Sequence, residues 1–299
     1  LGSDSRKLGG LARFRKMDNK LQAGRFILES GRTPDQILDA LLNGKPELYR
    51  ITIPEGLTWW QTADLLDKEG LARFDDFKNA IHDPEFLRHY GIPFASAEGF
   101  LMPDTYLFKK PDIPPDADES AINAAWAEQS RNIAGRLADN FWRKADALWP
   151  EKDGKAVRPD REGLKKYAIL ASIVEKETGM AAERARVAGV YANRLDKNMK
   201  LQADPTVAYG IGPAFKGPLK RSQLDDPANT YNTYQHAGLP PGPICSFGSA
   251  ALAAAIAPEK HDFLYFVAKT DGGEHQFSRA LEEHNRAVEA YRRQKKNRR

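Results

Sequence analysis

The sequence holds little of three things that would reveal a function at once: cysteine, long apolar runs and closely paired histidines. Its 299 residues include one cysteine, Cys245, so no disulfide can form within the chain. No window approaches the run of about 18 apolar residues that a membrane span needs, and no signal peptide is visible. The chain begins at Leu1 instead of a methionine, and we interpret it as shortened, so an N-terminal anchor stays compatible with it.

Signatures of several familiar chemistries are also missing. The six histidines form no HExxH pattern and no close ligand pair, so we expect no metal site. There is no G-x-S-x-G segment and no phosphate-binding glycine loop, and we expect no cofactor. The formal charge of +4 is small for this length, and we expect no nucleic-acid partner.

What remains is the composition of a folded protein with an α+β pattern. Hydrophobic content is 41% and charged content is 29%, which is ordinary for a soluble fold, and the length predicts two domains. Residues 1–22 are basic and poorly periodic and are predicted to be a linker. Residues 23–92 are predicted to form a small α/β unit, and residues 93–299 a larger mixed α/β domain.

The small unit has a strand–helix–strand–helix pattern. Residues 25–28 can form a strand, and Thr33 followed by Pro34 is typical of a helix start. Residues 49–53 alternate like a half-buried strand, and Thr58 precedes a second helix. This pattern suits a small glycan-binding module and equally suits any small α/β subdomain.

The larger domain is predicted to be mainly helical, with one hairpin near its end. Apolar periodicity predicts helices over residues 121–149, 161–179 and 182–198. Residues 263–267 and 276–277 predict a hairpin, and a terminal helix follows it.

Two glutamates near the end of the helix predicted at residues 161–179 differ in their surroundings. Each helical residue advances about 100°, so Glu177 falls on the apolar face and Glu175 lies about 160° away. A carboxyl on an apolar face is costly unless it is paired or neutral, and desolvation raises its pKa, which suits a general acid. The alternative is that Glu177 lies past the buried stretch and pairs with Arg184 or Arg186.

Two further segments carry polar groups. Asp204 before Pro205 predicts a helix start with Asp204 as the N-cap, which alone can explain that residue. Residues 229–234 combine amides, hydroxyls and aromatic faces, which a sugar site needs, although an exposed loop can contain them by chance. The stiff loop at residues 238–244 can wall a groove or merely connect two elements.

These segments together resemble the YceG-like family of endolytic murein transglycosylases. The matching runs follow the family's order and lie at residues 98–106, 171–178, 193–195, 201–207, 231–234 and 238–244. The similarity spans about Leu21 to Tyr291. The sequence departs from the family at residues 245–248, where a proline is expected before the last glycine.

The resemblance implies a substrate, a product and a location. It implies that residues 23–92 form a LysM-like module ahead of a catalytic domain at residues 93–299. It implies a lyase that cuts the β-1,4 bond between N-acetylmuramic acid and N-acetylglucosamine in nascent peptidoglycan strands, leaving 1,6-anhydro ends. It further implies a single-pass inner-membrane protein whose bulk lies in the periplasm, with peptidoglycan synthases as partners.

The resemblance also assigns residues. It places the catalytic glutamate on Glu177, which the helix geometry also selects, and it implies substrate contacts from Glu98, Glu175, Gln202, Asp204, Thr206, Tyr231, Asn232 and Tyr234. One rival interpretation is a non-catalytic wall-binding scaffold. Another is a hydrolase that uses Glu98 or Asp204 as a second carboxylate.

Overall fold

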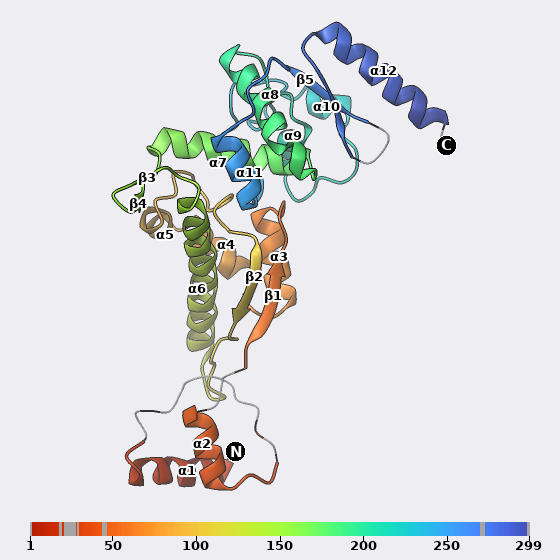
Figure 1. Cartoon of the computed structure of the whole chain (residues 1–299). Coiled ribbons are helices and arrows are strands. Elements are labelled where there is room, and N and C mark those ends of the chain that lie inside the picture. Colours follow the sequence, from red (N-terminus) through yellow and green to blue (C-terminus); the bar gives the residue numbers. More distant parts are fainter. Residues whose placement is uncertain are drawn as a thin grey trace.

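The computed structural model describes residues 2–17, 20, 28, 30–43, 47–269 and 273–297. The molecule is elongated, with α1 and α2 at one end and α12 at the other (Figure 1). The helices are α1 (Gly2–Phe14), α2 (Pro34–Asn43), α3 (Trp59–Lys68), α4 (Phe74–His82), α5 (Pro84–His89), α6 (Glu119–Asp146), α7 (Arg161–Glu177), the short 3-10 helix η2 (Ala181–Glu183), α8 (Arg184–Asp196), α9 (Asp204–Ile211), α10 (Arg221–Leu224), α11 (Ser249–Ile256) and α12 (Leu281–Asn297).

The strands form small antiparallel sheets. They are β1 (Tyr49–Ile53), β2 (Asp104–Phe108), β3 (Glu151–Lys152), β4 (Lys155–Ala156), β5 (Tyr265–Ala268) and β6 (His275–Ser278), and they pair as β1–β2, β3–β4 and β5–β6. Helices dominate and the sheets are antiparallel, so the predicted α+β class is confirmed. In the part of the chain that the structure describes, no helix combines the length and the apolar character needed to cross a membrane.

The N-terminal segment contains a helix where the sequence predicted only a linker. Helix α1 packs against α2, and Ala12 and Leu38 are buried. Thr33 caps α2 as predicted, because its hydroxyl accepts from the amide of Gln36 at 3.3 Å. Neither Ala12 nor Leu38 belongs to the main hydrophobic cluster, so this helical pair has an apolar contact of its own. The strand predicted at residues 25–28 lies largely outside the described residues.

Strand β1 finds its partner beyond the boundary that the sequence predicted at residue 92. It pairs with β2 in a register that places Ile51 opposite Tyr106. Ile51, Ile53 and Tyr106 all join the main hydrophobic cluster. The described part of the small unit therefore shares its core with the following segment, and a LysM-like module is not confirmed.

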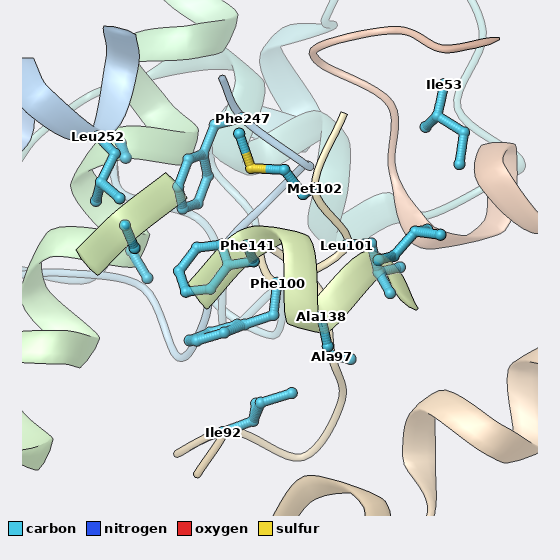
Figure 2. Close-up of a cluster of buried hydrophobic side chains, with 14 of the residues drawn as sticks. Ile53, Ile92, Ala97, Phe100, Leu101, Met102, Ala138, Phe141, Phe247 and Leu252 are labelled. Carbon is cyan, nitrogen blue, oxygen red and sulfur yellow. The ribbon is translucent and has the colours of Figure 1, made fainter. Parts of the chain in front are cut away.

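The main core joins segments that are far apart in the sequence. The ring of Phe100 packs against Phe141 of α6 at a tilt of 46°, with ring centroids 4.4 Å apart, and Phe247 contacts Phe141 with centroids 6.1 Å apart. Figure 2 shows these three rings together with Leu252 of α11. Gly99 has a φ of +82°, and a Cβ there would lie 2.7 Å from Pro243, so only glycine fits this approach. The segment around Phe100 is thereby held against the proline-rich loop.

Helix α7 is the central element of the C-terminal half. The side chain of Asp160 caps its start by accepting from the amide of Gly163 at 2.8 Å. Its apolar residues are buried against α8 and α11. The helix ends at Glu177, since Thr178 adopts an extended conformation with a φ of −142°. The candidate acid is therefore the last helical residue, where the chain leaves the core.

Candidate active site

A cavity of about 430 Å³ lies at the C-terminal end of α7. It draws side chains from α7, α8, the start of α9, strand β5 and α12, as well as from two loops. The lining residues are Glu177, Tyr191, Arg194, Leu201, Gln202, Asp204, Tyr234, Tyr265, Phe266, Leu281, His284 and Asn285. Of the nine site residues predicted from the sequence, this cavity brings together Glu177, Gln202, Asp204 and Tyr234.

Glu177 is a half-buried carboxyl with a strongly altered pKa. Burial raises the pKa of Glu177 to about 7, and the nearby charge of Asp204 also raises it. The hydroxyl of Tyr191 donates to Glu177 Oε1 at 2.9 Å and acts in the opposite direction, as does the charge of Arg194. Near neutral pH the carboxyl can therefore both give and take a proton.

Among the residues that the structure describes, Glu177 forms no ion pair with Arg184 or Arg186, the alternative that the sequence left open. The guanidinium of Arg184 lies 4.0 Å from Glu175 and 3.9 Å from Glu55. Arg186 pairs with Glu259 at 3.0 Å. The charged groups on either side are thus engaged elsewhere, and Glu177 faces the cavity.

Glu175 points away from the cavity, as the helix geometry predicted. Its Oε2 accepts from the amide of Gly248 at 3.0 Å, and burial raises its pKa. These contacts join α7 to the loop before α11. Glu175 does not line the cavity of Glu177.

Arg194 organises the loop that carries Gln202. This arginine is buried and donates to the backbone oxygens of Leu264 at 2.6 Å, Leu201 at 2.8 Å and Lys200 at 3.2 Å. A further bond of 3.3 Å reaches Gln202 Oε1. Gln202 itself has a φ of +52°, an uncommon conformation for a residue with a side chain. Arg194 therefore holds a strained turn at the cavity wall.

Asp204 is not the N-cap that the sequence predicted. The cap position belongs to Ala203, and no side chain caps α9. Instead, the hydroxyl of Tyr234 donates to Asp204 Oδ1 at 2.6 Å. A contact between the first residue of α9 and a loop 30 residues away thus holds the carboxylate of Asp204 at the cavity.

Thr206 and Asn232 support the loops and do not line the cavity. Both side chains are fully buried. The hydroxyl of Thr206 donates to the backbone oxygen of Ala203 at 2.7 Å. The amide of Asn232 donates to the oxygen of Asp226 at 2.9 Å and accepts from the amide of Tyr234 at 3.0 Å. Asn232 thereby fixes the backbone from which Tyr234 projects.

Tyr231 and Glu98 belong to a second cluster. The ring of Tyr231 packs against Tyr209 at 4.9 Å, and Tyr209 packs against Trp60 at 5.0 Å. Glu98 is buried beside them and accepts from the amide of Trp59 at 2.9 Å. Burial raises the pKa of Glu98 to about 8. Neither Tyr231 nor Glu98 lines the cavity of Glu177.

Several cavity residues were not singled out from the sequence. The family-matching runs at residues 193–195 and 201–207 contain two of them, Arg194 and Leu201. Tyr191 lies three residues before Arg194 and belongs to no motif that the sequence shows. The residues from β5 and α12 have no local signal, because tertiary packing alone brings them to Glu177.

A carboxyl whose pKa lies near neutrality, set in a cavity among tyrosines and an amide, suits an enzyme that works by general acid catalysis on a polar substrate. The chain belongs to the YceG-like family, because the sequence model of that family matches residues 3–290.

Named relatives and a solved structure agree with this membership. A Bacillus subtilis protein named endolytic murein transglycosylase is 32% identical over 289 residues, covering 90% of this chain and 73% of the relative. A Streptococcus pneumoniae protein of the same name is 26% identical, and the matched region covers 90% of this chain but 50% of that relative. The crystal structure of a putative yceG-like protein from Listeria monocytogenes has a TM-score of 0.62 and 29% identity, covering 95% of this chain and 91% of the other.

Proposed function

We propose that this protein is an endolytic murein transglycosylase that cuts peptidoglycan glycan strands with Glu177 as its acid and base. Family membership and the names of its relatives support the reaction class. The observation that supports the residue is the carboxyl of Glu177, whose pKa is raised to about 7 inside a cavity. A general acid works best with a pKa near the working pH.

One carboxyl is enough because the substrate supplies the other reacting groups. Protonated Glu177 donates to the glycosidic oxygen while the bond from that oxygen to C1 of N-acetylmuramic acid breaks. The N-acetyl oxygen of the same sugar bonds to C1 and gives an oxazolinium. The C6 oxygen then attacks C1, its proton passes to Glu177, and the N-acetyl group is restored. The product is a 1,6-anhydro end, and no water is consumed.

The neighbouring side chains have complementary roles. Tyr191 fixes one oxygen of the acid, and the raised pKa of Tyr191 keeps its hydroxyl protonated as a donor. Gln202 and the Asp204–Tyr234 pair offer hydrogen bonds to sugar hydroxyl and N-acetyl groups. Phe266 adds an apolar face to the same cavity, which suits a pyranose ring.

The rival interpretations make different demands on these residues. A non-catalytic scaffold has no need of a near-neutral carboxyl in a cavity. A hydrolase would use Asp204 as a second carboxylate to activate water, as most glycosidases do. Asp204 lines the cavity, but one of its oxygens is occupied by the hydroxyl of Tyr234.

Mass spectrometry of glycan strands digested by the protein separates these functions. We expect anhydro ends, which are lighter than reducing ends by one water. Reducing ends would establish a hydrolase, and undigested strands that still bind would establish a scaffold. The Glu177→Gln variant serves as the control, because it keeps the cavity shape and removes the acid.

The location of the enzyme and its partners belong to the same proposal. Peptidoglycan lies outside the inner membrane. We therefore propose that the full protein is anchored in the inner membrane and that the part described above lies in the periplasm. Its partners there would be the synthases that make nascent strands. We also propose that residues 23–92 act as a LysM-like glycan-positioning module. A periplasm-dependent reporter fused after residue 297 tests the orientation, since an inactive reporter would contradict it.

A further inference from the structure

One wall of the Glu177 cavity comes from the C-terminal helix. The first turns of α12 contribute Leu281, His284 and Asn285. The imidazole of His284 stacks on the ring of Tyr265, with centroids 5.3 Å apart and an interplanar angle of 24°. The guanidinium of Arg194 lies 5.1 Å from the centroid of the same tyrosine ring. Through these contacts the imidazole is tied to the strained turn that carries Gln202.

Both ring nitrogens of His284 lack a hydrogen-bond partner in the part of the chain that the structure describes. Nδ1 is enclosed, whereas Nε2 is not among the enclosed atoms and stays open to the cavity that His284 lines. Two other histidines of the same half are satisfied. His261 Nε2 lies 2.9 Å from the backbone oxygen of Arg186, and His275 Nδ1 lies 2.7 Å from Glu183. A buried polar group without a partner is uncommon in native folds, and among these three histidines only His284 lacks one.

The surroundings of His284 favour its neutral form. Burial and the charge of Arg194 lower its pKa. A neutral imidazole offers one N–H donor and one acceptor nitrogen. Sugar hydroxyl and N-acetyl groups also offer donors and acceptors without charge, so they match such a ring.

We propose that His284 is a substrate-binding residue that hydrogen-bonds through Nε2, its open ring nitrogen, to a hydroxyl or N-acetyl group of the sugar beside Glu177. This inference rests on the proposed glycan-cleaving function. His284 transfers no proton in it, and its contribution is to hold the sugar against the acid. Helix α12 thereby becomes part of the site.

The test measures glycan affinity in the Glu177→Gln background, where strands bind without being cut. Isothermal titration with defined glycan oligosaccharides compares this background with the added changes His284→Phe, His284→Asn and His284→Gln. The phenylalanine keeps a flat ring over Tyr265 and removes both nitrogens. We expect about three- to tenfold weaker binding, the effect of one neutral hydrogen bond.

The amide variants separate hydrogen bonding from packing. The amide nitrogen of asparagine falls near the position of Nδ1 and that of glutamine near Nε2, while neither stacks like an aromatic ring. Recovery of affinity by glutamine supports the inference. Unchanged affinity in His284→Phe, or a loss that glutamine does not recover, overturns it. Glu282→Gln is the matched control, because this exposed neighbour on α12 lies outside the cavity lining.

Failure of this inference and failure of the proposed function look different. If the protein is not a transglycosylase, the unmodified chain produces no anhydro ends, whatever His284 does. If only the role of His284 is wrong, the unmodified chain produces anhydro ends and His284→Phe binds glycan as tightly as its background.

Discussion

Replacing Tyr191 by phenylalanine should raise the pKa of Glu177 above its value of about 7. The hydroxyl of Tyr191 donates to Glu177 Oε1 at 2.9 Å, and this bond favours the ionised carboxyl. A hydrogen bond to a charged group contributes about 1.5–3 kcal/mol. Since about 1.4 kcal/mol corresponds to one pH unit, we expect the pKa to rise by about one to two units. Phenylalanine keeps the edge-on ring contact with Phe266, whose centroid lies 5.9 Å away.

The pH dependence of strand cleavage checks this expectation. Protonated Glu177 begins the reaction, so the decline of kcat/KM at alkaline pH should move upward in Tyr191→Phe by the same one to two units. Tyr167→Phe is the matched control. Tyr167 lies on α7, the helix that carries Glu177, but its ring packs against Trp149 and does not line the cavity. An alkaline limb that stays in place, or that moves to lower pH, would refute the reasoning.

Four further expectations concern the same residues and the chain ends. Glu177→Gln should lower the cleavage rate by orders of magnitude and Glu175→Gln by less; the reverse order in a digestion assay would show that the acid is misassigned. Since the pKa of Glu177 is raised from 4.5 to about 7, the folded state holds this proton more tightly than the unfolded state, and stability is lost as pH rises through that window. Glu177→Gln should therefore stabilise the protein by up to about 3 kcal/mol at pH 8 and little at pH 4, and equal urea midpoints at pH 8 would contradict this. Asp204→Asn should lower the pKa of Glu177 and move the alkaline limb of cleavage toward acid, because the Asp204 charge raises that pKa; an unmoved limb would count against the coupling. A chain beginning at Pro93 should fail to fold because β2 loses its partner strand, whereas one beginning at Glu47 should fold, and circular dichroism distinguishes the two.

Local rules accounted for the features that depend on near neighbours in the chain. The 100° helical step separated Glu177 from Glu175, and the structure directs them to different surroundings. Thr33 and Thr58 begin helices as predicted, because a cap needs only the next three residues. The hairpin at β5 and β6 was likewise found from its pattern.

Local rules misjudged residues whose partners are distant. Asp204 precedes a proline as an N-cap residue often does, yet its carboxylate caps no helix and accepts a hydrogen bond from the hydroxyl of Tyr234. Tyr231 and Tyr234 share one short segment, yet Tyr234 lines the cavity while Tyr231 packs on Tyr209. Which of the two surroundings a side chain enters depends on the distant surface that packs against the loop. The spacing of apolar residues along the sequence gives no information about that surface.

The sequence by itself therefore determined the α+β class, the helix that bears Glu177 and the face on which this glutamate lies, because backbone geometry and nearby caps set them. Only the tertiary structure decided that β1 pairs across residue 92 and that α12 brings His284 to the acid. It also decided that the pKa of Glu177 lies near neutrality. Desolvation depends on everything packed around a carboxyl, and those neighbours come from segments that meet only when the chain folds.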